Sequence, residues 1–242
     1  KEIVLTGINL GDFGKTSKKA NNSNFLNLIK ELDILDLDLR FRISSIEPNL
    51  LSDEIIEFVS TSKKFVHHFH IPLQSGSDTI LKLMRRRYDA DLYESRINKI
   101  NELMPNACIG VDVIVGFPGE DDDKFLESMS FLETLDISYL HVFTYSERDN
   151  THAISLPNIV QSNIRSKRSK LLRILSSRKK ADFYKKHLGS THNVLFESEN
   201  KNGFIEGFSS NYLRFRRKWD SSLEGSVIKS KFTEIDSEGF AI

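Results

Sequence analysis

Five polar or glycine-rich segments, each following a stretch of β-type sequence, hold the residues best placed for chemistry. They are Gly7–Asn9, Ser44–Pro48, Pro72–Ser77, Gly116–Glu120 and Thr144–Ser146. In parallel α/β folds the loops after successive strands lie together at the carboxyl end of the sheet, where ligands bind. A single loop of this kind is most simply a turn, but five of them favour a binding site at that edge.

The first of these segments opens a sequence that resembles a phosphate-binding loop. Gly14-Lys15-Thr16 matches the end of the Walker A motif, which also requires a glycine five positions before Gly14. That position is Asn9 in this chain. We therefore do not expect a nucleoside triphosphate site here.

The histidines and the cysteine do not by themselves define a metal site. On a strand only His68 and His70 would share a face, and no third ligand is identifiable near them in the sequence, so we expect no metal there. Cys108 is the only cysteine, and its apolar neighbours predict a small core residue. One cysteine excludes a disulfide within the chain and any all-cysteine iron–sulfur or zinc site built from this chain alone.

Two basic stretches point to a polyanionic partner. Ten Lys or Arg residues against the single Asp182 lie between Gln161 and His187, and such cations repel one another unless a polyanion or an acidic surface lies nearby. Residues 211–219 interleave cations with three aromatic residues, of which Phe215 would face a core if the segment alternates as a strand. This mixture is typical of surfaces that bind single-stranded nucleic acid. The residues expected to bind RNA are Arg214, Arg216, Arg217, Lys218 and Trp219.

Hydrophobic periodicity predicts five strands that alternate with helices. The predicted strands are Glu2–Thr6, Leu39–Ser44, Phe65–Leu73, Ala107–Phe117 and Ser138–Tyr145. The predicted helices are Asn24–Leu35, Ser52–Thr61, Asp78–Arg85, Ala90–Met104, Asp122–Leu135 and a long basic helix over about 162–187. This alternation is typical of α/β proteins with a parallel sheet or a (β/α) barrel.

The pattern changes after the long basic helix, where short β-type segments are separated by turn signals. We expect residues 188–242 to form a small all-β barrel of the OB type. Residues 1–187 would then form the first domain, with the basic helix at its end and the boundary near Gly189.

The composition fits a folded protein, because 39% of the 242 residues are hydrophobic and wholesale disorder is excluded. No apolar run approaches the roughly 18–20 residues that a membrane-spanning helix needs. The 34 basic and 34 acidic residues cancel, so the charge is segregated rather than in excess. Lys1 is not a start methionine and the residues after it already have a strand pattern, so we expect a piece of a longer protein.

Five motifs, in this order and spacing, resemble those of the radical S-adenosylmethionine (SAM) methylthiotransferases. They are Thr6–Asp12, Arg42–Pro48, His70–Asp78, Met84-x-Arg86-x-Tyr88 and Asp112–Glu120. The resemblance covers nearly the whole chain. It implies an incomplete radical SAM (β/α) barrel holding strands 2 to 6, followed by a TRAM domain, the family's OB-like, RNA-binding β-barrel.

Three substrates occur in this family: isopentenyladenosine in tRNA, threonylcarbamoyladenosine in tRNA, and an aspartate of a ribosomal protein. The turn Gly7-x-Asn9-x-Gly11-Asp12 and the loop Ser44–Pro48 are most similar to the threonylcarbamoyladenosine branch. The resemblance therefore implies 2-methylthiolation of N6-threonylcarbamoyladenosine at position 37 of tRNA. Three alternatives stay open: the isopentenyladenosine branch, a different radical SAM or (β/α)-barrel enzyme, and a non-catalytic RNA-binding module.

The resemblance also implies cofactors and partners. The family uses SAM and two [4Fe–4S] clusters, which are held by a Cys-x3-Cys-x2-Cys loop after the first barrel strand and by an N-terminal cysteine domain. Neither cysteine set is in this sequence, so we expect the chain alone to hold no cluster, to have no catalytic residue or metal ligand of its own, and to be inactive. The expected partners are the tRNA anticodon stem-loop and an electron donor, in the cytoplasm and without a membrane.

Placement at strand ends and in adjacent loops selects the candidate SAM-binding residues. They are Asn9, Glu47, Gln74, Arg86, Asp112 and Tyr145. Arg86 is the candidate for the methionyl carboxylate, because a guanidinium group binds a carboxylate through two parallel hydrogen bonds. In cofactor enzymes of this kind the protein orients the cofactor and excludes water. These side chains can converge on one ligand only if the strands form one barrel face.

Overall fold

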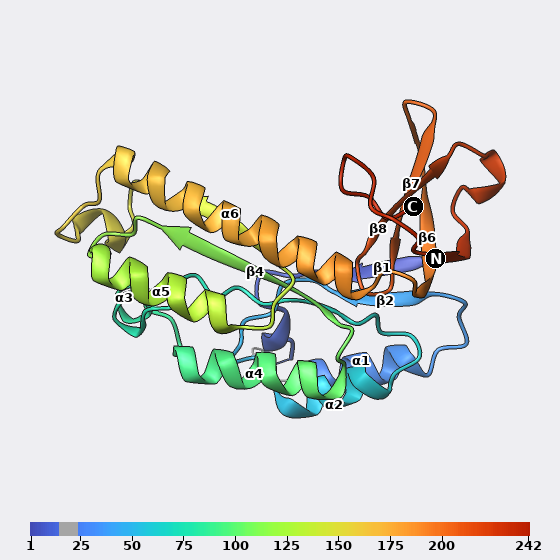
Figure 1. Ribbon diagram of the computed structural model, residues 1–242. Coiled ribbons are helices and arrows are strands. Elements are labelled where there is room, and N and C mark those ends of the chain that lie inside the picture. Colours follow the sequence, from blue (N-terminus) through green and yellow to red (C-terminus); the bar gives the residue numbers. More distant parts are fainter. Residues whose placement is uncertain (15–23) are drawn as a thin grey trace.

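The computed structural model describes residues 1–14 and 24–242. The larger part of the fold is built on five parallel strands, which lie side by side in chain order and alternate with helices (Figure 1). Isolated bridges from Phe41 to Phe65 and from Ser45 to His70 join a two-stranded group to a three-stranded one. The parallel strands are β1 (Glu2–Leu5), β2 (Arg40–Ile43), β3 (His68–His70), β4 (Cys108–Val115) and β5 (Tyr139–Thr144). The five predicted strands and their parallel arrangement are confirmed.

Within these described ranges, six α-helices and two short 3₁₀ helices connect the parallel strands and follow the last of them. Three of the helices begin at a residue whose side chain accepts a hydrogen bond from the first turn, namely Asn24, Asp89 and Asp121. The helices are α1 (Phe25–Asp33), α2 (Asp53–Thr61), α3 (Asp78–Leu83), α4 (Ala90–Leu103), α5 (Asp122–Thr134) and α6 (Ser162–Lys186), with η1 (Leu10–Asp12) and η2 (His152–Ser155). Lys15 and Thr16 of the phosphate-loop-like motif lie outside the described residues.

Strand β3 is shorter than the predicted Phe65–Leu73. At its start Phe65 forms only an isolated bridge to Phe41. After His70 the chain reaches Pro72, which has no N–H to donate, and then Gln74, whose φ of 71° leaves the extended region. The polar segment after the strand therefore turns at the edge of the sheet.

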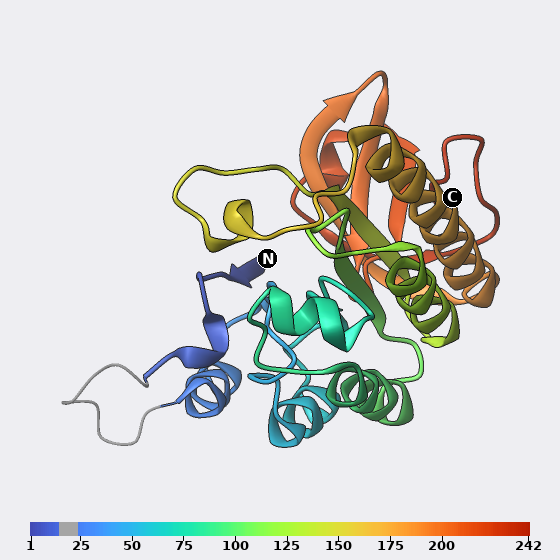
Figure 2. The same ribbon diagram turned by 90° about the vertical axis from the view of Figure 1, so that its left-hand side faces the viewer.

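The two faces of the parallel sheet differ in chemistry because side chains alternate along each strand. On one face Val111, Val113 and Leu140 are buried in the main hydrophobic core, which also includes residues of the helices. On the other face Asp112 is half-buried and His141 is exposed. The fold thus leaves polar side chains partly exposed on the inner face of the sheet. Figure 2 shows the course of the parallel strands and the helices that lie beside them.

Residues after α6 form a four-stranded antiparallel sheet with its own hydrophobic core. The strand order is β8-β7-β6-β9, and a bridge from Phe215 to Ala241 brings the end of the chain beside β8. A β-carbon at Gly207 would overlap the backbone of Leu195, so the close approach of β6 and β7 requires glycine there. The elements are β6 (Thr191–Lys201), β7 (Phe204–Ser209), β8 (Arg214–Lys218), η3 (Ser221–Leu223) and β9 (Val227–Lys231). Closure into an OB-type or TRAM barrel stays a prediction.

The antiparallel sheet packs against the amino ends of the parallel strands. The Arg40 guanidinium donates to the carbonyl of Phe208 at 2.9 Å, and the Asn211 amide donates to the carbonyl of Asn106 at 3.1 Å. The ring of Tyr212 stacks on that of His68, with centroids 4.2 Å apart. The opposite, carboxyl ends of the parallel strands are therefore left for a ligand. Within residues 1–14 and 24–242, no helix has the length and apolarity needed to cross a bilayer.

A glycine on the inner face of β4 tests this packing. A β-carbon at Gly110 would overlap the ring of Tyr139 on the neighbouring strand, so Gly110→Ala should lower the free energy of unfolding by about 1–3 kcal/mol. Urea titration followed by circular dichroism measures the change. Gly7→Ala is the control, because its nearest neighbour would lie 3.7 Å away, and it should be neutral or slightly stabilising. Equal stability of the two variants would contradict the packing of Tyr139 over Gly110.

Candidate functional site

A cavity of about 530 Å³ lies where β4 and β5 end. Its walls include the aromatic rings of Phe117, Phe143 and Tyr145, and the guanidinium groups of Arg86 and Arg148. The rings of Phe117 and Tyr145 meet edge to face with centroids 5.3 Å apart. The cavity thus combines flat apolar walls with positive charge, which suits a ligand that has an aromatic part and an anionic part.

Two buried polar atoms at this cavity have no hydrogen-bond partner among the described residues. They are the Tyr145 hydroxyl oxygen and Nε of Arg86. Arg86 also donates from Nη1 to the carboxylate of Glu47 at 3.1 Å, which fixes the direction of its side chain. An unpaired buried polar group costs about 1–3 kcal/mol, so a ligand that hydrogen-bonds to these atoms would gain affinity.

Arg165 of α6 holds the loop that follows β5. Its Nε donates to the carbonyl of Val160 at 2.7 Å and its Nη1 to the carbonyl of Tyr145 at 2.9 Å. The third nitrogen pairs with the carboxylate of Glu147, which is exposed, whereas Arg165 itself is buried. The backbone at Tyr145 is therefore fixed by a helix more than a dozen residues further along the chain.

Arg168, one turn further along α6, holds the loop that follows β4. It donates to the carboxylate of Glu120 at 2.8 Å and to that of Asp122 at 2.7 Å. Glu120 in turn accepts from the backbone N–H of Gly116 at 2.6 Å. Burial raises the pKa of Glu120, while Gly116 and Arg168 act in the opposite direction. The Gly116–Glu120 loop is thus closed by a buried ion pair.

Contacts within the chain therefore account for part of the basic charge of α6. Arg165, Arg168 and Arg178 pair with carboxylates, and Lys179 and Lys186 donate to backbone carbonyls. Of the two expectations for this helix, a polyanion or a nearby acidic surface, the second is met in part by carboxylates of the chain itself. Repulsion on the helix is reduced because these three arginines are paired with carboxylates of the chain.

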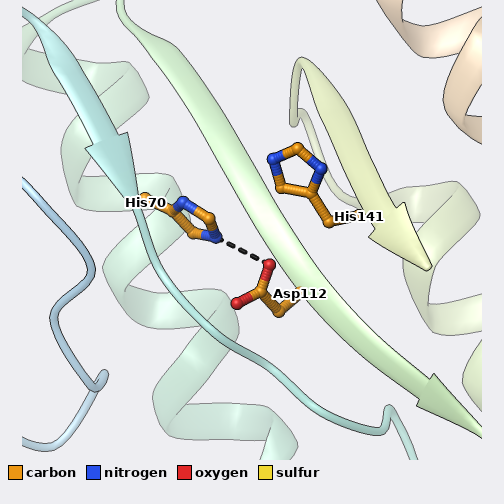
Figure 3. Close-up of side chains that lie close together, drawn as sticks. All are labelled: His70, Asp112 and His141. Carbon is orange, nitrogen blue, oxygen red and sulfur yellow. Dashed lines mark hydrogen bonds and ion pairs between the residues drawn. The ribbon is translucent and has the colours of Figure 1, made fainter. Parts of the chain in front are cut away.

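Below the cavity, two residues nearer the amino ends of β4 and β5, three polar side chains from three strands come together (Figure 3). Nε2 of His70 lies 2.8 Å from Oδ1 of Asp112, and the rings of His70 and His141 have centroids 5.4 Å apart. Burial and the neighbouring His70 lower the pKa of His141, so its imidazole is neutral at neutral pH. The strand register supplies the third group that the sequence around His70 did not show.

The structure places the six predicted SAM-binding residues unequally. Arg86 and Tyr145 line the cavity, and Glu47 contacts it through Arg86. Asp112 lies below with His70, and Gln74 is joined to β4 by backbone hydrogen bonds. Asn9 is exposed before η1 and is not part of the cavity wall. Sequence reasoning did not name four residues of the wall. Phe117 lies in the Gly116–Glu120 segment and Phe143 in β5, and Arg148 and His152 lie in the segment after β5.

The predicted RNA-binding residues also differ in whether their side chains are exposed and unpaired, and so free to contact RNA. Arg214 and Arg216 both pair with the buried carboxylate of Glu206, and Arg216 also pairs with Asp236 and Glu238. Trp219 is half-buried against the core of the antiparallel sheet. The exposed cations are Arg217 and Lys218, which form no ion pair with the described residues.

A second cavity, of about 360 Å³, separates β5 and α6 from the antiparallel sheet. Lys180 and Arg214 supply positive charge to its wall, and Phe208 and Tyr212 supply stacked rings with centroids 4.7 Å apart. His141 belongs to the same wall. This cavity therefore approaches the inner face of the parallel sheet from the amino end of its strands.

Comparison with known proteins first identifies the class of protein. Residues 16–132 match the Radical SAM superfamily. The radical SAM enzyme coproporphyrinogen III oxidase HemN of Escherichia coli superposes with a TM-score of 0.50, over 76% of this chain and 50% of that chain, at 11% identity. This likeness concerns the fold alone, and it supports a radical SAM-type fold.

The relatives then narrow the class. The chain is 38% identical over 237 residues to the threonylcarbamoyladenosine tRNA methylthiotransferase MtaB of Bacillus subtilis, covering 96% of this chain and 52% of that protein. It is 34% identical over 236 residues to the tRNA-2-methylthio-N(6)-dimethylallyladenosine synthase of Sulfurimonas denitrificans, covering 97% and 54%. The chain is thus similar over nearly all of its length to tRNA methylthiotransferases, and it carries a Radical SAM superfamily match. It spans about half the length of the curated relatives it matches.

The residues of this chain fit SAM, one of the cofactors that the family implies, but they do not fit an iron–sulfur cluster, the other one. The unpaired Arg86 Nε and Tyr145 hydroxyl, beside aromatic rings, suit the carboxylate and adenine of SAM. An iron–sulfur cluster needs several thiolates, and Cys108 is the only cysteine. Cys108 is buried in β4, and burial raises the pKa of its thiol to about 12. It is therefore a protonated core residue rather than a ligand.

The buried ion pair at the end of β4 can be tested directly. Arg168→Ala leaves the carboxylate of Glu120 buried without its cation, so the free energy of unfolding should fall by about 3–5 kcal/mol. Urea titration measures this loss. Lys167→Ala, an exposed neighbour on the same helix, should change it by less than about 0.5 kcal/mol. A loss in Arg168→Ala no larger than in the control would show that the loop does not depend on the pair.

Proposed function

We propose that this chain is the SAM-binding and tRNA-binding core of a methylthiotransferase that acts on N6-threonylcarbamoyladenosine at position 37. The observation that carries the proposal is the cavity at the ends of β4 and β5, with its unpaired Tyr145 hydroxyl and Arg86 Nε. The substrate is suggested by the similarity to a threonylcarbamoyladenosine tRNA methylthiotransferase at 38% identity. Relatives named for dimethylallyladenosine, at 33–34% identity, make that nucleoside the second candidate.

In this proposal the cavity residues bind and orient SAM. Phe117 and Tyr145 pack against the adenine, and Arg86, oriented by Glu47, pairs with the methionyl carboxylate. SAM supplies the transferred methyl group and the radical chemistry of the family. The clamps at Arg165 and Arg168 keep the two loops in place, so that orientation does not cost entropy on binding.

The proposed tRNA contacts lie at the other end of the strands. The exposed Arg217 and Lys218 provide phosphate contacts, and Lys180 provides another at the mouth of the second cavity. The stacked rings of Phe208 and Tyr212 form an apolar wall of that cavity for a base. Arg214 and Arg216 have smaller roles than their positions in the sequence suggest, because both pair with Glu206, and Arg216 also pairs with Asp236 and Glu238.

SAM binding is tested by removing one hydroxyl group. Tyr145→Phe should weaken SAM binding by about 3- to 10-fold in calorimetry, since one hydrogen bond contributes about 0.5–1.5 kcal/mol. The melting temperature should stay the same or rise, because the hydroxyl has no partner within the described residues. Tyr184→Phe, a hydroxyl deletion in the core of the antiparallel sheet, should leave the SAM affinity unchanged. Equal affinities of both variants and the parent chain would remove Tyr145 from the site.

RNA binding is tested with anticodon stem-loops that carry threonylcarbamoyl, isopentenyl or unmodified adenosine at position 37. Fluorescence anisotropy should give the tightest binding for the threonylcarbamoyl form. Arg217→Ala with Lys218→Ala should weaken binding of all three stem-loops. The same double variant should reduce the salt slope by about one unit for each phosphate that the protein no longer neutralises.

The matched control removes two exposed lysines from helices of the parallel-sheet part, Lys30→Ala with Lys82→Ala. It should retain the slope of the parent chain. A slope that falls equally in both double variants would show a diffuse charge effect. Tightest binding of the isopentenyl form would assign the chain to the second candidate substrate.

A further inference from the structure

We propose that His70, Asp112 and His141 bind a divalent transition-metal ion of the zinc class. Two imidazoles and one carboxylate are the ligand types that zinc and related ions take from proteins. Within the described residues these three form a group whose donor atoms all lie within 4.8 Å of one another. The site is separate from the iron–sulfur chemistry of the family, because it contains no thiolate.

The strand register brings the three donors to one level of the inner face. Asp112 of β4 lies directly opposite His141 of β5, while His70 of β3 lies opposite Gly110, one inward-facing position earlier on β4. All three side chains point into the same space (Figure 3). Three different strands thus supply one ligand each, on a framework with a buried core on its other face.

Only a small movement separates this arrangement from coordination. Ligands about 2.0–2.1 Å from a tetrahedral zinc lie roughly 3.3 Å from one another. His70 and Asp112 are already 2.8 Å apart, so they need to open slightly. His141 is exposed and makes no hydrogen bond with the described residues, so its ring can turn toward the pair without breaking another bond.

The local charges favour a cation at this position. Within the described residues His70 is the only ionisable group paired with Asp112, and no lysine or arginine pairs with it. The guanidinium of Arg42 pairs with the carboxylate of Glu2, which it shares with Arg40, and it does not pair with Asp112. A metal ion would therefore meet a carboxylate that no described lysine or arginine neutralises.

Three protein ligands leave a fourth position open on the metal. His141 also lines the cavity between β5 and the antiparallel sheet, so the open position is accessible from that side. Structural zinc sites have four protein ligands, whereas sites that bind water or a ligand atom have three. The geometry therefore points to an ion that contacts a bound ligand rather than one that only holds the fold together.

Metal titration of the chelator-treated chain tests the proposal. Isothermal calorimetry with zinc should show one ion bound per chain, and cobalt should give the visible absorption of a low-coordinate site. His141→Ala should weaken binding by more than about 10-fold, and the exposed position of His141 keeps that variant folded. Asp112→Asn, which keeps the shape of the side chain, should weaken it similarly.

The control is His67→Ala, which removes a histidine outside the cluster and should leave the affinity unchanged. No stoichiometric binding by the parent chain, or equal binding by His141→Ala and His67→Ala, would overturn the proposal. The titration contains neither SAM nor RNA, so its failure leaves the proposed function standing, and the SAM and stem-loop measurements do not depend on zinc.

Discussion

The buried ion pair between Arg168 and Glu120 is the interaction on which the carboxyl end of the sheet depends. Glu120 ends the glycine-rich loop after β4, and its carboxylate binds both the guanidinium and the backbone N–H of Gly116. A β-carbon at Gly116 would overlap the side chain of Arg165, so the two arginines and the loop occupy one tightly packed volume. Helix α6 thereby fixes both loops that form the cavity, without lining the cavity itself.

The polar inner face exists because the outer face of the parallel sheet is well packed. Buried aliphatic residues on β4 and β5 hold the strands against the helices, so the alternate positions need not contribute to the core. Those positions are occupied by histidine, aspartate and tyrosine, which cost stability when buried but are half-exposed or hydrogen-bonded here. The same alternation that stabilises the fold thus supplies the chemistry of its interior.

The sequence was sufficient for features that depend on local periodicity. Apart from the shorter β3, the parallel strands and the helices lie where the hydrophobic pattern predicted them, and the order of the strands puts Arg86 and Tyr145 at one cavity. It was insufficient where register or long-range pairing decides. The approach of His141 to His70 depends on which residues lie opposite across β4, and the neutralisation of Arg216 depends on carboxylates far away in the chain.

The stacking of Tyr212 between His68 and Phe208, beneath the guanidinium of Arg42, couples the antiparallel sheet to the parallel one. A sheet anchored in this way cannot pivot freely. The 8 residues of β4 span about 25 Å, at roughly 3.3 Å per residue, between the antiparallel sheet and the cavity at the ends of β4 and β5. An RNA held on the antiparallel sheet would then present nucleotides to the interior at a fixed reach. Under the proposed function, this fixed distance would select a position along the RNA in addition to the identity of the base.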